Sequence, residues 1–118
     1  MKLVNALCST NFTEIHYENR GEQKYNAPHH FSIREVSTGD ILSFIDFQEG
    51  PIKEVGVNGV HNEDLIAIVL TRLEYFQNTD FACKENEKAI EKLEEALMWL
   101  RKRTLNRQAR NVEGTSKI

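Results

Sequence analysis

The sequence has little cysteine, no long apolar run and no secretion signal. Cys8 and Cys83 are its two cysteines in 118 residues, and neither has another cysteine or a histidine at zinc-ligand spacing. No stretch approaches the ~18 consecutive apolar residues of a membrane span. The apolar part of residues 1–8 is too short for the h-region of a signal peptide. We therefore expect two free thiols in a reducing cytoplasm and no membrane partner.

Recognisable catalytic and metal-binding motifs are also missing. Among the four histidines, only His29 and His30 are neighbours, and adjacent residues of a strand point to opposite faces. The tetrapeptide 56–59, Gly-Val-Asn-Gly, precedes a predicted helix. It has neither the lysine nor the hydroxyl residue of a phosphate-binding P-loop. The sequence therefore predicts a protein that is not an enzyme and that uses no metal ion and no cofactor.

The charges are distributed unevenly along the chain. The net charge is −3, yet residues 101–118 hold six of the 15 Lys and Arg and one of the 18 Asp and Glu, a charge of +5. Residues 1–100 therefore have a charge of −8. Affinity for a nucleic acid polymer grows with the number of phosphates that a broad basic surface neutralises. A compact anion suits this local positive charge better than a nucleic acid polymer does.

The first half of the chain has strand-like patterns. Residues 30–36 and 41–47 are typical of two strands, and the turn-rich residues 37–40 between them predict a β-hairpin. Both faces of the second strand contain apolar residues, which predicts burial on both sides. Residues 52–57 could add a short third strand, and the polar residues 19–27 are expected to form a loop.

The second half changes to helical periodicity. Apolar residues recur at spacings of three and four from residue 63 to about 77, with Asn62 as the expected N-cap. A second and longer helix is predicted from about 81 to 108, capped by Thr79 or Asp80. The short connection between the two favours an antiparallel hairpin.

The predicted fold class is therefore α+β in a single domain, residues 1–118. It combines an antiparallel β-rich part, residues 1–60, with a two-helix hairpin, residues 61–110, and a polar tail, residues 111–118. The last helix is longer than its neighbour by more than ten residues, so its distal half, with Met98 and Trp99, has no partner within the hairpin. We expect a second copy of the chain to cover it in a homodimer.

The long helix has an apolar stripe that ends in arginines. The stripe consists of Ala82, Asn86, Ala89, Ile90, Leu93, Ala96, Leu97 and Leu100. Continued at spacings of three and four, it reaches Arg103, Arg107 and Arg110. Planar guanidinium groups on one face can clamp phosphate oxygens. The alternative is that these cations complement the dipole of the helix end and face water.

Two further residues are candidates for ligand contact. Asn86 interrupts the apolar stripe, and a buried amide without partners costs about 1–3 kcal/mol. It would therefore bond either a ligand or the neighbouring loop at Asn78 and Thr79. Phe76 lies at the end of the first helix, where an aromatic face can stack on a nucleobase or pack into the core.

Four separated runs of the sequence resemble a known family. They are Phe47–Glu54, Gly56–Gly59, Phe81–Asn86 and Val112–Thr115. In the same order, similar runs occur in the phage Thoeris anti-defence proteins of the first type, and the resemblance covers about residues 45–118. These proteins are sponges, which bind the immune signal glycocyclic ADP-ribose and sequester it without degrading it. They share a helical hairpin with the anti-CBASS sponges.

The resemblance implies a ligand site between two protomers. It implies a homodimer, in some members a trimer of dimers, that acts in the cytoplasm of the infected bacterial host. By similarity, Phe76 would stack on an adenine, Asn86 would hydrogen-bond the ligand, and Arg103 and Arg107 would hold the pyrophosphate. Arg110 and the turn that contains Thr115 would close the pocket.

Other functions stay open at this point. Sibling sponges bind cyclic di- or trinucleotides of CBASS defence, and a hydrolase could instead cleave the cyclic signal. A third alternative is a module that docks a nucleic acid or a protein on its basic helix end, which the acidic remainder of the chain disfavours.

Overall fold

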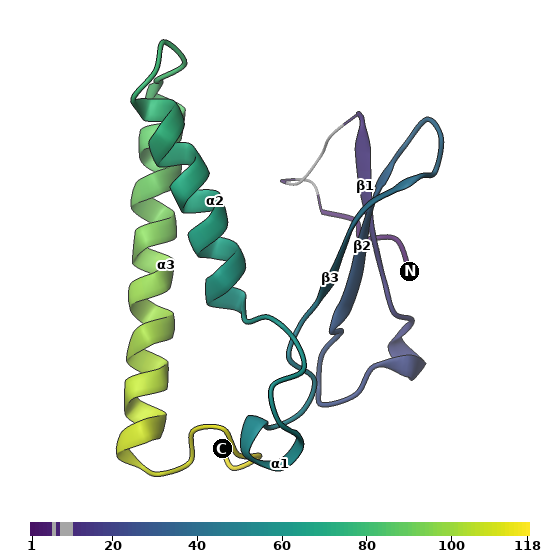
Figure 1. Ribbon diagram of the computed structural model, residues 1–118, viewed down its shortest axis with the longest axis vertical. Coiled ribbons are helices and arrows are strands. Elements are labelled where there is room, and N and C mark those ends of the chain that lie inside the picture. The colour runs from purple at the N-terminus through teal and green to yellow at the C-terminus, as the bar shows by residue number, and fades with distance from the viewer. Residues whose placement is uncertain (6, 8–10) are drawn as a thin grey trace. The chain divides into compact units, whose positions relative to one another are not determined.

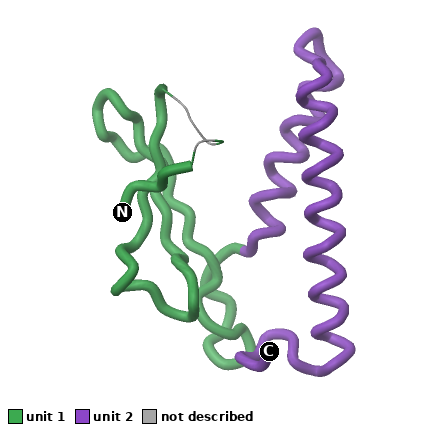
Figure 2. Tube along the Cα trace, turned by 180° about the vertical axis from the view of Figure 1, so that it is seen from behind, with its two compact units in different colours: residues 1–60 green, residues 61–118 purple. Residues whose placement is uncertain are grey.

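The chain folds into two compact units, residues 1–60 and 61–118 (Figure 2). This is the arrangement of a computed structural model that describes residues 1–5, 7 and 11–118. Strands β1 to β3 belong to the first unit, and helices α2 and α3 belong to the second (Figure 1). The predicted α+β class is confirmed.

Of the two cysteines, Cys83 is a free, exposed thiol, and Cys8 lies outside the described residues. In the part of the chain described, no helix has both the length and the apolar character needed to cross a membrane.

The first unit contains a three-stranded antiparallel sheet in the order β1-β2-β3. Strands β2 (His30–Glu35) and β3 (Ile41–Asp46) form the predicted hairpin, which is confirmed. The connecting loop turns at Gly39, whose φ of 75° lies in the left-handed region that favours glycine. Strand β1 (Thr13–Tyr17) joins the other side of β2 and was not foreseen.

The predicted burial of both faces of β3 is wrong. Five of its six residues are exposed, with Leu42 58% and Phe44 69% accessible. β3 is an outer strand, because β2 is its only neighbour in the described sheet. The described helices of residues 1–60, η1 (Arg20–Glu22) and α1 (Ile52–Val55), are single turns. Neither is long enough to form a second layer over the strand.

The predicted strand at residues 52–57 is also wrong, since α1 (Ile52–Val55) occupies this stretch. The carbonyl oxygen of Pro51 accepts hydrogen bonds from the amides of Glu54 and Val55, at 3.0 and 2.9 Å. Proline fixes φ near the helical value and lacks the amide that a strand would use. Local hydrogen bonds of a turn therefore replace pairing with the sheet.

The two runs 47–54 and 56–59, which contribute to the family resemblance, are braced against each other. The side chain of Gln48 donates to the carbonyl oxygens of Gly50 and Gly56, at 3.0 and 2.8 Å. The side chain of Asn58 accepts from the amide of Glu49 and donates to its carbonyl, at 2.8 and 2.7 Å. The loop therefore has a defined shape that polar side chains impose, and residues 1–60 lead directly into the helical unit.

The second unit is a hairpin of α2 (Asn62–Gln77) and α3 (Lys84–Ala109), which lie side by side (Figure 1). The two predicted helices are confirmed, but α2 begins one position earlier than expected. His61 is its N-cap, and Asn62 is its first helical residue. The carboxylate of Asp64 accepts from the amide of His61 at 2.9 Å, which fixes the start of the helix at this point.

The expected caps of the long helix, Thr79 and Asp80, are wrong as well. Cys83 is the N-cap of α3, and its Sγ accepts from the amide of Asn86 at 3.4 Å. The side chain of Gln77 bonds both the amide and the carbonyl of Cys83, at 3.0 and 3.1 Å. These bonds hold the connection in a turn, so that helix formation starts later than residue 81.

Apolar residues are incompletely covered in both units. No described apolar side chain is fully buried; the buried residues are His29, Ser32 and Arg107. The stripe of α3 from Ala89 to Leu100 is half-buried, which fits its position against α2. Elsewhere on α3, Met98 and Trp99 are 71% and 62% exposed. Large exposed apolar side chains on one helix are typical of a surface that another chain covers.

Candidate functional site

The arginine-rich end of α3 is shaped by a tight reversal of the chain. Asn111 adopts a left-handed φ of 56°, and its amide donates to the carbonyl of Gln108 at 3.0 Å. The amide of Val112 donates to the carbonyl of Arg107, also at 3.0 Å. This pair of bonds is the Schellman motif, in which asparagine can replace glycine at the left-handed position. The tail therefore folds back toward the last turn of the helix.

Arg107 lies at the centre of this folded tail. Its Nε donates to the Glu113 carboxylate at 3.2 Å. Its Nη1 and Nη2 donate to four main-chain carbonyl oxygens, those of Lys117, Ile118, Val112 and Thr115, at 2.9 to 3.2 Å. A guanidinium has five N–H donors, and all five are used here. The side chain is only 8% exposed. In this structure Arg107 organises the tail and has no donor left for a ligand.

The other two arginines of the stripe differ from Arg107. Arg103 is exposed, and its side chain has no hydrogen bond or ion pair among the described residues. Arg110 is exposed and donates to Asn106 Oδ1 and to the carbonyl of Ile118, at 3.0 and 3.1 Å, which leaves three donors free. The hydroxyl of Thr115 donates to the carbonyl of Val112 within the tail turn. Among the three arginines of the stripe, Arg103 and Arg110 are therefore the ones with free donors in the described structure.

Phe76 lies at the opposite end of the hairpin, beside the α2–α3 turn. Its ring is packed edge-on against Phe81, with centroids 6.5 Å apart at 81°. The guanidinium carbon of Arg72 lies 5.3 Å from the centroid of the Phe76 ring. Arg72 was not predicted as a candidate, although its spacing of four from Phe76 on one helix was a usable signal. The ring is 36% exposed, so a ligand can reach part of it.

Asn86 lies in the first turn of α3, near the same end. The residue is half-buried, and within the described chain its side-chain amide has no hydrogen-bond partner. The neighbouring loop does not use it: Thr79 bonds the carbonyl of Phe76 at 2.6 Å, and Gln77 bonds Cys83. The predicted alternative, in which Asn86 bonds the loop at Asn78 and Thr79, is therefore not observed. A half-buried amide without partners is available for a ligand or another chain.

The candidate residues therefore form two groups, one beside the turn between α2 and α3 and one at the tail end of α3. Asn86 and Phe76 are near the turn, and the arginines are near the tail. At a helical rise of ~1.5 Å per residue, Asn86 and Arg107 are roughly 30 Å apart along α3. One helical hairpin cannot bring both groups to one small ligand.

A separate charged cluster lies in residues 1–60 and was not predicted. His30 is bonded through Nδ1 to Asp46 at 2.8 Å and through Nε2 to Glu49 at 2.6 Å. These hydrogen bonds, Asp46 first, raise the pKa of His30 above its ordinary value. Burial acts to raise the pKa of the Glu18 carboxyl, but the amides of His30 and His29 donate to it and lower that pKa overall. In the part of the chain described, no group of three metal-ligating side chains could hold a metal ion.

Comparison with known proteins identifies relatives over almost the whole chain. The family described as Acb2/Tad1, hairpin domain, matches residues 40–105. The chain belongs to this family. A protein of Bacillus phage SBSphiJ7, named Thoeris anti-defense 1, is 44% identical, and the similarity covers 97% of this chain and 96% of that protein. The resemblance predicted from the four runs is confirmed.

The match to the Acb2/Tad1 hairpin family covers the candidate residues unequally. Residues 40–105 include Phe76, Asn86 and Arg103. Arg107, Arg110 and the folded tail lie beyond that range, and only the comparison with the phage protein reaches them. The family match therefore includes most of the hairpin, and the tail is covered by the similarity to the phage protein alone.

Proposed function

We propose that the chain is an anti-Thoeris sponge, which binds glycocyclic ADP-ribose in the cytoplasm of an infected bacterium and sequesters it without breaking it. The observation that carries this proposal is the 44% identity, over nearly the full length of both chains, to a phage protein named Thoeris anti-defense 1. Membership of the Acb2/Tad1 hairpin family supports the same conclusion. Capture by such a sponge keeps the free signal below the level that activates the host effector.

The chemistry of the free groups suits this ligand. Glycocyclic ADP-ribose has a purine ring, ribose hydroxyls and a doubly charged pyrophosphate. The donors of Arg103 and Arg110 suit the pyrophosphate, because charge-assisted bonds from guanidinium to phosphate are strong and directional. The exposed part of the Phe76 ring suits stacking on the purine, and the unpartnered amide of Asn86 suits a polar edge of the ligand.

Arg107 and Thr115 have a different part in this proposal. Both are bonded within the folded tail, and the tail follows directly after the two free arginines. Arg107 positions this tail so that the turn at Thr115 can close over a bound ligand. A direct contact of Arg107 with the pyrophosphate would require phosphate oxygens to replace the carbonyl oxygens it now binds.

A homodimer brings the two groups of candidate residues together. If two copies of α3 pair in opposite directions, Asn86 of one chain approaches the arginines of the other. The point about which such a pair is symmetric lies midway between Asn86 and Arg107, close to the exposed Met98 and Trp99. Met98 and Trp99 lie on another face of α3 than Asn86, so the interface would have to extend around the helix to cover these apolar side chains. Two-fold symmetry would create two equivalent sites, each with groups from both protomers.

Calorimetry with glycocyclic ADP-ribose tests the function directly. We expect tight binding near one ligand per protomer and recovery of intact ligand after heating of the complex. Chromatographic detection of a cleaved product would instead indicate a hydrolase. Absence of binding would contradict the proposed ligand, and cyclic di- and trinucleotides of CBASS defence would be titrated next.

A matched pair of variants locates the site. Arg103→Gln should weaken binding at least about tenfold, because a free guanidinium is lost from the pyrophosphate. Arg101→Gln removes the same charge two positions earlier, about 200° away around the helix, and should leave binding nearly unchanged. Equal losses in both variants would indicate a general effect of charge in place of a defined site.

A further inference from the structure

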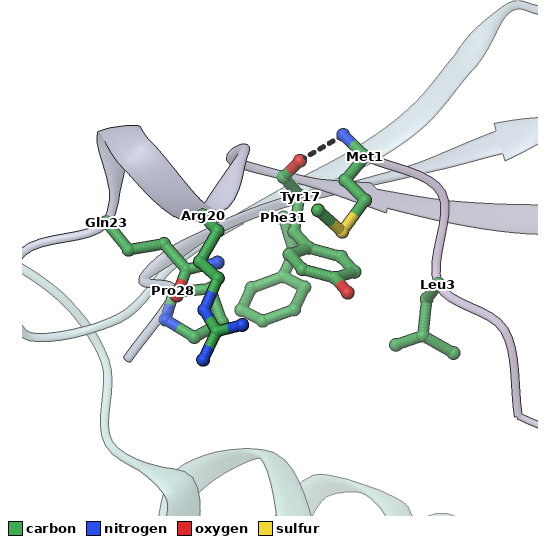
Figure 3. Close-up of a pocket in the computed structure, with 7 residues that line it drawn as sticks. All are labelled: Met1, Leu3, Tyr17, Arg20, Gln23, Pro28 and Phe31. Carbon is green, nitrogen blue, oxygen red and sulfur yellow. Dashed lines mark hydrogen bonds between the residues drawn. The ribbon is translucent and has the colours of Figure 1, made fainter. Parts of the chain in front are cut away.

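The unit of residues 1–60 contains a cavity that the proposed function does not use. Its volume is about 590 Å³, within the range of roughly 300–1,000 Å³ that is usual for small-molecule sites. Two aromatic rings and the N-terminal segment form its apolar walls, and a polar side chain and a cationic one line the remaining side (Figure 3). The described residues that line it all belong to one compact unit, and the cavity is open to solvent on one side.

The apolar walls are held in place by the sheet. Tyr17 and Phe31 are paired positions on β1 and β2, and their rings lie 5.7 Å apart at an angle of 33°. Phe47 supports Phe31 from another side, with its ring edge-on at 5.5 Å. Residues Met1 and Leu3 run beside β1, with backbone bonds of 2.8 Å to Tyr17 and Ile15. The rings are therefore positioned before any ligand arrives.

The polar side is provided by the turn η1 and the residue after it. Arg20 lines the cavity and has no side-chain partner among the described residues. The neighbouring acids are occupied: Glu22 accepts from Asn19 at 3.4 Å, and Glu18 accepts from the amides of His29 and His30.

Gln23, from the same side, donates through its Nε2 to the carbonyl of Glu18 at 3.3 Å. This bond orients the side chain, and its Oε1 remains available as an acceptor. Figure 3 shows Arg20 and Gln23 on the same side of the two rings. An unpaired guanidinium beside aromatic walls is a combination that favours an anion attached to a flat ring.

We propose that this cavity binds a small molecule with a planar aromatic ring and an anionic group, a carboxylate or a phosphate. The ring lies against Tyr17 and Phe31, and the anion binds the guanidinium of Arg20. An N–H group of the ligand can donate to Gln23 Oε1. This site shares no residue with the arginine-rich end of α3, and the inference does not depend on the sponge function.

The test is an NMR titration of the full chain, observed at the aromatic resonances of Tyr17 and Phe31. The probes are 1-naphthoate, which presents the carboxylate, and adenosine monophosphate, which presents the phosphate. Neutral counterparts are 1-naphthalenemethanol and adenosine, and inorganic phosphate lacks the ring. Arg103→Gln should leave these shifts unchanged, which separates binding in the cavity from binding of the nucleotide near Arg103.

We expect at least one charged probe to shift both resonances and to bind about tenfold or more tightly than its neutral counterpart. The probe that binds distinguishes a carboxylate from a phosphate ligand. Arg20→Gln should abolish this preference for the anion. The control Lys24→Gln removes a charge from the same exposed segment, outside the cavity lining, and should keep the preference. Equal binding of charged and neutral probes, no shift with any of them, or equal losses in the two variants would overturn the proposal.

Discussion

The two ends of helix α3 differ in how completely their polar groups are bonded. At the tail end, every donor of Arg107 is used within the chain. At the turn end, the amide of Asn86 is half-buried and has no partner in the described structure. A folded chain ordinarily satisfies its buried polar groups. Arg107 is therefore committed to contacts within its own chain, whereas the Asn86 amide is open to contact with water, a ligand or another chain.

This comparison favours a site that two chains share. The turn end offers an aromatic ring and an amide, and the tail end offers the free arginines. Since about 30 Å separates the two ends on one helix, each end would find its complement on a second copy.

The largest effect is expected from Trp99→Glu. Trp99 is 62% exposed, so the substitution should leave the hairpin folded, but it would bury a charge at the proposed interface. In a two-fold symmetric dimer the substitution occurs twice in the interface. At about 2 kcal/mol for each central residue, the dissociation constant of the dimer should rise roughly a thousandfold. Sedimentation at micromolar concentration should show a monomer, and binding of glycocyclic ADP-ribose should be lost. Thr71→Glu, on an exposed position of α2, is the control. A dimeric Trp99→Glu protein with normal binding would exclude this interface.

The next effect concerns the unbonded end. Asn86→Ala should weaken ligand binding about tenfold, the usual value of one or two hydrogen bonds. It should leave the melting temperature unchanged or slightly higher, because alanine favours the helix and no internal bond is lost. Gln77→Ala is the contrasting variant: it removes two bonds to Cys83 and should lower the melting temperature. A clear drop for Asn86→Ala in differential scanning calorimetry would mean that Asn86 has an internal role after all.

A smaller and more local effect is expected at the bonded end. Arg107→Ala removes the bonds to four carbonyl oxygens and to the Glu113 carboxylate, at a cost of about 1–3 kcal/mol. The carbonyl of Val112 keeps Thr115 as a donor, and that of Ile118 keeps Arg110. Because water can reach an opened tail, we expect faster amide hydrogen exchange over residues 112–118 and little change in the middle of α3. Lysine at this position should not restore protection, since it lacks the planar set of donors. Arg103→Ala is the control and should leave exchange as it is; an unprotected tail in the wild type would contradict this role.

The elements that the sequence predicted well are the ones with strong periodicity. Two helices with apolar residues at spacings of three and four were found with ends within about three residues of the observed ones. β1 was missed because five residues give a weak signal, although Thr13, Ile15 and Tyr17 alternate with polar residues. α1 was taken for a strand because its residues suit either structure, and the local bonds to Pro51 decided between them.

The sequence suggested candidate residues for the site but not the hydrogen bonds that they make. Arg103 and Arg107 lie on α3 and Arg110 is its C-cap, yet only Arg107 of the three is buried. The burial of Arg107 depends on main-chain carbonyl groups of the folded tail. Every residue has such a group, so the sequence alone does not indicate which of them will lie near Arg107. A usable signal was Asn111 just past the helix end, since asparagine there favours a reversal of the chain.

The smallest effect concerns His30, which is a weaker counterpart of Arg107 in residues 1–60. Both are cations that hold a loop by charged hydrogen bonds, but His30 is exposed and can lose its charge. Its bonds to Asp46 and Glu49 raise its pKa. The protonated ring therefore stabilises the fold fully below the unfolded pKa of about 6.5, and this contribution disappears as the pH rises through the higher folded pKa.

Urea unfolding near pH 5.5 and near pH 8.5 measures this contribution. The wild type should be more stable than His30→Gln at the lower pH, and the difference should shrink at the higher pH. Because solvent screens an exposed pair, we expect less than about 1 kcal/mol. The control is His61→Gln, in the helical unit, and NMR titration of the His30 ring gives its pKa directly. If the stability difference between the wild type and His30→Gln were the same at pH 8.5 as at pH 5.5, His30 would act through neutral hydrogen bonds. It would then differ in mechanism from Arg107, which is permanently charged.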